Sequence, residues 1–236
     1  MVRWRAVFWP LANGLTPNEM KDIMSTQTDI EHRRAHLYAW FSTLFAHELD
    51  ARQVEALSAG PWQNVLATLE ACGFDAPVAD LRAALSTLSG QGDLRLELAA
   101  DFAQTFLRDQ KHSALPYASI YRDENGLLCA ADEAKMRELL QASGLQVADD
   151  VGEPADHVAV LLAYLAHLIE QHAEDDDASA AAHAQVAFIE GALLNWVPTF
   201  ARKCRTVDDA CFYPALSAAL SDYLQADLDY LKGAQA

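Results

Sequence analysis

The chain has 236 residues, of which 52% are hydrophobic, so it can bury a large core and does not have the composition of a disordered protein. Its 17 Lys and Arg residues stand against 34 Asp and Glu residues, which gives a formal net charge of −17 at pH 7. The basic residues are scattered, so this charge excludes a nucleic-acid-binding surface and favours basic partners.

The first 26 residues differ in pattern from the rest of the chain. Arg3 and Arg5 precede a short apolar stretch, which superficially suggests a secretory signal. Pro10 ends that stretch too early for a signal peptide, and no small-residue cleavage pattern follows. We therefore expect residues 1–26 to be a disordered or artefactual extension, with Met24 fitting a natural start.

Apolar residues recur at helical spacing from residue 27 onward, which predicts an all-α fold. In the first predicted helix, Glu31 and Arg34 lie on a polar face opposite an apolar stripe. That stripe consists of Ile30, Leu37, Tyr38, Phe41, Leu44 and Phe45. Further helices are predicted from residue 61 to 73, 77 to 90 and 94 to 108, and residues 27–121 form an N-terminal helical subdomain.

The helical period is lost between Asp109 and Ala131, where Pro116 and an Asn-Gly pair favour a loop with one short helical turn. We place a hinge at residues 122–131. A C-terminal helical subdomain at 132–236 follows, with helices predicted at 132–143, 154–172, 180–196 and 208–231. Because one connector joins two bundles, exchange of halves in a domain-swapped homodimer is left open.

No apolar run reaches the roughly 18 to 20 residues that span a bilayer, so no membrane partner is expected. The four cysteines, at positions 72, 129, 204 and 211, lack the close spacing of zinc or redox sites. We expect free buried thiols, no bound metal and a cytoplasmic location.

The sequence contains none of the common phosphate-loop, dinucleotide-binding, hydrolase or zinc-helix motifs, so an ordinary enzyme is not indicated. His32 and His36 are four residues apart, but no third ligand accompanies them, and we interpret both as surface residues.

The densest polar group of residues lies at 149–157, directly before a long apolar helix. Pro154 suits the first helical position and Glu153 the cap region, which leaves Asp156 to accept orphan N–H groups at the third position. His157 borders the apolar stripe near the helix start. Two interpretations stay open: a well-capped core helix, or the mouth of a partner-binding groove.

Two tyrosines and a serine lie close together in the connecting loop, at Tyr117, Ser119 and Tyr121. Amphipathic rings in a loop are typical of binding surfaces, although the same rings can simply cover a helical bundle.

Several of these segments together resemble the TorD/DmsD/NarJ family of redox-enzyme maturation chaperones. Residues 153–157 resemble its E-P-x-D-H signature, and residues 116–121 resemble its Y-A-S-x-Y segment. Weaker matches lie at Asp101-Phe102, Phe106-Leu107, Trp196-Val197-Pro198 and Phe212-Tyr213. The ordered set extends from about residue 30 to 231.

The resemblance implies an all-helical, non-catalytic chaperone without a cofactor of its own. Its partner would be the twin-arginine signal peptide and apo form of a molybdoenzyme, closest to trimethylamine N-oxide reductase. The chaperone would protect this client while molybdopterin guanine dinucleotide is inserted before export. The resemblance also implies weak binding of guanine nucleotides (GTP), although no phosphate loop is present. The peptide-binding residues carried over by motif are Asp156, His157, Glu153, Tyr117, Ser119 and Tyr121.

Two other classes of function remain open from the residues alone. One is a metal-dependent helical hydrolase that uses Asp156 and His157 with His167 or His172. The other is an interaction scaffold that binds folded proteins without recognising signal peptides.

Overall fold

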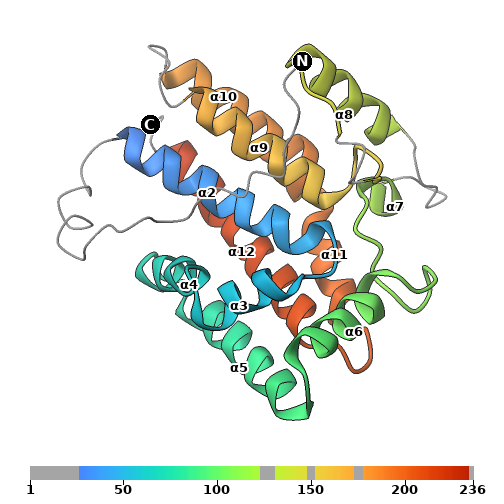
Figure 1. Cartoon of the computed structure of the whole chain (residues 1–236). Helices are drawn as coiled ribbons and strands as arrows, with labels where there is room; N and C mark the ends of the chain where they lie inside the picture. The colour runs from blue at the N-terminus through green and yellow to red at the C-terminus, as the bar shows by residue number, and fades with distance from the viewer. Residues whose placement is uncertain (1–26, 123–130, 148–151, 173–177, 234–236) are drawn as a thin grey trace.

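The computed structural model describes residues 27–122, 131–147, 152–172 and 178–233, and these residues form a helical fold without a named strand (Figure 1). The all-α prediction is confirmed. The predicted extension, residues 123–130 of the predicted hinge, Cys129, Asp149 and Asp150 lie outside the described residues. The helices are α2 (Gln27–Ala46), α3 (Ala51–Ala59), α4 (Trp62–Ala71), α5 (Asp75–Gln91), α6 (Leu94–Phe106), α7 (Ala118–Arg122), α8 (Ala131–Ala142), α9 (Val158–His172), α10 (Ala178–Phe188), the π-helix η1 (Ile189–Leu194), α11 (Val197–Cys204) and α12 (Phe212–Gly233).

Helix α12 lies behind α2 in the view of Figure 1 and packs against α5, α6, α10 and α11. Its predicted apolar face is buried along its whole length. Helix α2 lies along α9, so both predicted subdomains contribute to one buried apolar cluster. The boundary at 122–131 and the exchange of halves stay predictions.

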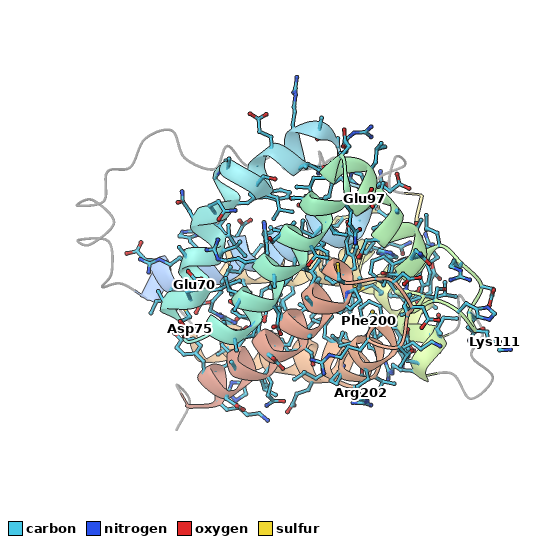
Figure 2. All side chains as sticks on the ribbon, turned by 90° about the horizontal axis from the view of Figure 1, so that it is seen from below. Glu70, Asp75, Glu97, Lys111, Phe200 and Arg202 are labelled. Atoms are coloured by element: carbon cyan, nitrogen blue, oxygen red, sulfur yellow. The ribbon has the colours of Figure 1, made fainter. Side chains whose placement is uncertain are left out.

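Aromatic rings from four helices meet in the interior. Phe45 of α2 lies 6.0 Å from Phe106 of α6 and 6.1 Å from Phe200 of α11, and Phe106 lies 5.2 Å from Tyr213 of α12. Figure 2 shows Phe200 among the interior side chains, whereas Lys111 lies at the rim of the molecule. Each such ring adds roughly 1.5 to 3 kcal/mol by burial, so this cluster fixes α2, α6, α11 and α12 together.

The polar face predicted for the first helix is wrong at Glu31 and Arg34, which are both buried. Arg34 is 5% exposed, and its Nε and Nη2 atoms lie 2.6 and 2.9 Å from the carboxylate oxygens of Asp227 on α12. It also donates to Gln185 at 2.8 Å and pairs with Glu31. Ile30, expected in the buried stripe, is 37% exposed instead. Arg34 is buried because Asp227 is buried, and a buried carboxylate without a positive partner would strongly destabilise the folded chain.

Two short helices escaped the sequence prediction. Helix α3 begins with a capping box, in which the Asp50 carboxylate accepts from the Gln53 N–H and the Gln53 side chain accepts from the Asp50 N–H, both at 2.8 Å. Helix α11 follows Trp196 with Pro198 in its first turn. Capping boxes and first-turn prolines are readable signals, so both helices could have been found.

Candidate functional site

The two motif segments pair with each other through their backbones. The Val158 N–H donates to the Pro116 carbonyl at 2.8 Å, and the Ala118 N–H donates to the Asp156 carbonyl at 3.1 Å. This isolated antiparallel bridge keeps residues 154–157 out of the helix, so α9 begins at Val158. The prediction that Pro154 opens the helix, with Asp156 capping it, is therefore wrong.

The Asp156 carboxylate serves the neighbouring helix instead. Its Oδ2 atom accepts from the backbone N–H of Ser119 at 2.9 Å, in the first turn of α7. Both side chains are 0% exposed. Within the described residues, Asp156 Oδ1 and Ser119 Oγ have no hydrogen-bond partner. Buried polar atoms are nearly always paired, so the lone pairs of Asp156 Oδ1 leave a place for a hydrogen-bond donor.

His157 and Tyr117 form the other half of the bridge. Their rings lie edge to face with centroids 5.1 Å apart, and the Tyr117 hydroxyl donates to Glu153 at 2.6 Å. His157 is 2% exposed, and burial lowers its pKa to about 3. Its Nδ1 atom accepts from the Ala159 N–H at 3.1 Å. The ring is thus neutral and acts as an acceptor at the start of α9.

Tyr121 lies apart from the other motif residues. Its ring stacks on Trp196, with centroids 5.5 Å apart, and contacts Phe200 edge-on at 6.0 Å. Burial raises its pKa. The structure therefore brings together five of the six predicted peptide-binding residues and places Tyr121 in the aromatic core.

A cavity of about 370 Å³ lies beside this bridge, between α7, α8, α9, α10 and η1. Asp156 reaches its lining, whereas Tyr117, Glu153 and His157 are not among the lining residues. The lining is mostly apolar, with Leu161, Tyr164 and Leu168 contributed by α9. On α10 and η1 it consists of Ala184, Ala187, Phe188, Gly191 and Ala192; on α7 and α8, of Ala118, Arg122, Asp132, Lys135, Met136 and Leu139.

Sequence reasoning missed most of this lining. Ala184, Ala187 and Gly191 are spaced by three and four residues, which places small side chains on one helix face. This spacing could have identified the small-residue face of the cavity from the sequence. Leu139, on the facing helix α8, is 41% exposed and would be unusual on a surface without a partner.

Charged groups gather at the α7 end of the cavity. Arg122 Nη1 lies 2.5 Å from Asp132 Oδ1 and donates to the Gly191 carbonyl at 3.4 Å. The same carbonyl accepts from the Asn195 side chain at 2.6 Å. Gly191 belongs to the π-helical turn, and such turns are frequent at functional sites because they redirect backbone carbonyls.

In the described part of the chain, no group of three His, Cys, Asp or Glu side chains could hold a metal ion. Cys204 is buried, as expected, and burial raises its pKa to about 12. The prediction of buried thiols is wrong for Cys72, which is exposed at the end of α4.

Among the described residues, no helix combines the length and the apolar character that crossing a membrane requires.

Comparisons with known proteins agree with one another. The family model described as nitrate reductase delta subunit matches residues 69–202. The chaperone protein TorD of Vibrio parahaemolyticus is 38% identical over 210 residues, covering 85% of this chain and 95% of that protein. TorD of Aliivibrio fischeri is 36% identical over 214 residues, covering 89% of this chain and 100% of that protein.

A crystal structure from Archaeoglobus fulgidus, provisionally described as a redox enzyme maturation protein, aligns with a TM-score of 0.48 at 20% identity. The alignment covers 81% of this chain and 93% of that chain.

The two TorD relatives are named as chaperones and not as enzymes, and their matches extend over most of both chains. With its all-helical fold and the paired motif segments, the chain belongs to the TorD family of chaperone proteins.

Proposed function

We propose that this chaperone binds the twin-arginine leader peptide of a molybdoenzyme precursor in the cytoplasm. It holds the apo form while molybdopterin guanine dinucleotide is inserted, before export. The client that fits the resemblance is trimethylamine N-oxide reductase. The TorD relatives support a maturation chaperone of this kind.

The cavity between α8, α9 and α10 carries this proposal. Its volume of about 370 Å³ falls in the range of small-ligand pockets, and its lining is mostly apolar. A leader peptide offers a dicationic segment followed by an apolar stretch. The apolar lining suits the stretch, and the charged α7 end, with Asp132 and Asp156, suits the cations.

Magnitudes assign different roles to the two ends of the cavity. Burial of each large apolar side chain is worth roughly 1.5 to 3 kcal/mol, whereas an exposed ion pair contributes about 0.2 to 1 kcal/mol. The apolar lining therefore sets the affinity, which we expect to be on the order of 1 μM or tighter. The carboxylates set selectivity, and the net charge of −17 accelerates encounter with a cationic leader.

Isothermal titration calorimetry tests the proposal directly. The purified chain is titrated with the leader peptide and with a matched peptide in which both arginines are glutamines. We expect the arginine peptide to bind more tightly. Equal affinity for both peptides would favour a general scaffold, and no binding of either would refute leader recognition.

A variant that fills the cavity gives a second test. Ala187 is exposed and lines the cavity, so Ala187→Trp should block the leader without disturbing the buried core. Ala182→Trp is unsuitable as a control because Ala182 packs against the core, whereas Ala39→Trp places the same ring on an exposed position of α2. We expect loss of leader binding only for Ala187→Trp.

A further inference from the structure

The Arg122 side chain already occupies the charged end of the cavity. Its guanidinium lies between Asp132 Oδ1, at 2.5 Å, and the Gly191 carbonyl, at 3.4 Å. We propose that Arg122 holds the place of a leader arginine, and that the leader binds by exchanging its own guanidinium for that of Arg122. This inference rests on the proposed function and assigns its regulation to one residue.

The acceptors at this end favour a guanidinium over an ammonium. Asp132 is on α8 and Gly191 is on η1, so a cation that serves both must bridge two helices. Arg122 reaches both acceptors through the same Nη1 atom. A guanidinium is more weakly hydrated than an ammonium, so it costs less to place beside Asp132, whose side chain is only 14% exposed. The end therefore favours arginine over lysine.

The exposed fractions of the Arg122 and Asp132 side chains show which residue can leave the ion pair. The Asp132 side chain is 14% exposed, whereas the Arg122 side chain is 30% exposed. Asp132 is thus the less hydrated partner and requires a cation, while Arg122 can swing into water at little cost. Arg122 is also the last residue of the five-residue helix α7, so its release disturbs little regular structure.

Two other ion pairs of the molecule lack this property. Arg34 and Asp227 are only 6% and 3% exposed and cannot exchange partners without opening the core. Arg137 and Glu133 lie on α8 at 58% and 14% exposure, but neither lines the cavity. The second pair provides a matched control on the same helix as Asp132.

The order of groups along the cavity fixes the direction of the leader. Arg122, Asp132 and Asp156 lie at the α7 end, and Gly191 meets Arg122 there. Ala184 lies two helical turns before Gly191, and besides Arg122, Asp132 and Asp156 the lining holds one charged residue, Lys135 on α8. The arginines of the leader therefore bind beside α7, and its apolar stretch follows the small-residue face of α10 away from it.

Calorimetry on three variants tests the exchange. The variants are Arg122→Gln, Asp132→Asn and the control Arg137→Gln, each titrated with leader peptides carrying two arginines, two lysines or two glutamines. We expect Arg122→Gln to bind the arginine peptide about threefold to tenfold more tightly than the unaltered chain, because the internal competitor is gone. The glutamine peptide should gain nothing, and the lysine peptide should gain less.

We expect Asp132→Asn to lose much of the preference for the arginine peptide over the glutamine peptide, because only Asp156 then remains to meet a leader arginine, and Arg137→Gln to behave like the unaltered chain. Unchanged or weaker binding of the arginine peptide by Arg122→Gln would overturn the exchange. So would an undiminished preference for arginine over glutamine in Asp132→Asn. If the unaltered chain bound no leader at all, the proposed function itself would fail. Thermal melting of each variant confirms that the affinities compare folded proteins.

Discussion

Two replacements of Asp156 separate its structural work from its part in binding. Its Oδ2 atom accepts from the Ser119 N–H at 2.9 Å, while Oδ1 has no partner in the described part of the chain. Asp156→Ala removes both oxygens. Asp156→Asn keeps an acceptor for the Ser119 N–H but removes the charge, so the two variants should differ in stability and agree in affinity.

The stability difference follows from the buried hydrogen bond. Asp156 and Ser119 are both 0% exposed, so Asp156→Ala leaves a buried N–H group unpaired, at a cost of about 1.5 to 3 kcal/mol. For a chain of this length, each kcal/mol lowers the melting temperature by about 2 to 4 °C, which predicts a decrease of about 3 to 12 °C. For Asp156→Asn we expect a loss below about 1 kcal/mol.

The assay combines thermal melting with calorimetry against the arginine leader peptide. We expect both variants to bind about tenfold or more weakly, as the loss of a charge-assisted hydrogen bond implies. Asp101→Ala is the matched control, because Asp101 is 3% exposed and accepts from the Phe212 and Tyr213 N–H groups far from the cavity lining. It should lose stability without losing affinity. Full leader affinity in Asp156→Asn would show that the carboxylate serves folding alone.

Three further outcomes can be measured. Burial lowers the His157 pKa to about 3, so protonation of the unfolded chain below pH 6.5 removes about 2 kcal/mol of stability by pH 5. Urea unfolding at pH 7 and pH 5 measures this loss. Between these pH values the free energy of unfolding of His157→Gln should fall by that much less than that of the unaltered chain, and an equal fall in both proteins would contradict a buried neutral ring. Asp227→Ala should lose about 3 to 5 kcal/mol because the buried Arg34 loses the carboxylate that accepts from its Nε and Nη2 atoms, whereas Asp229→Ala, at an exposed position, should be nearly neutral. Leader affinity should weaken only modestly with added salt, and its complete loss would exclude an apolar cavity as the main source of binding.

The long helices were predictable because apolar periodicity records a helix face directly. The prediction for α12 succeeded residue by residue, since its Leu216, Leu220, Leu224 and Leu228 side chains all lie in the core. The same rule failed at Arg34. Periodicity assigns a charged residue to water, and it cannot anticipate the buried carboxylate of Asp227, 193 positions along the chain, that pairs with Arg34.

The sequence picked out the motif residues, but neither their geometry nor most of the cavity lining. The motifs identified Tyr117, Ser119, Glu153 and Asp156, which the fold brings together. Local capping rules then placed Asp156 in α9, because they cannot account for the backbone bridge to Pro116. The lining of the cavity could not be predicted for a similar reason: Leu139 and Ala187 belong to separate helices that line one cavity only in the folded chain.

The burial of the signature residues limits what they can do for a ligand. His157 is neutral and lies outside the lining, where it contacts the Tyr117 ring and accepts from the Ala159 N–H at the start of α9, so we expect it to support the site without touching the leader. Asp156 can offer only Oδ1, and with 0% exposure it does so only after neighbouring side chains part. Selection for a cationic leader must therefore begin at the more exposed Arg122 and Asp132. Release of Arg122, which lies one turn from Ala118 on α7, clears the same end of the cavity that Asp156 lines. In the proposed mechanism, exchange at Asp132 therefore comes before contact with Asp156, which a ligand reaches only after it has displaced Arg122.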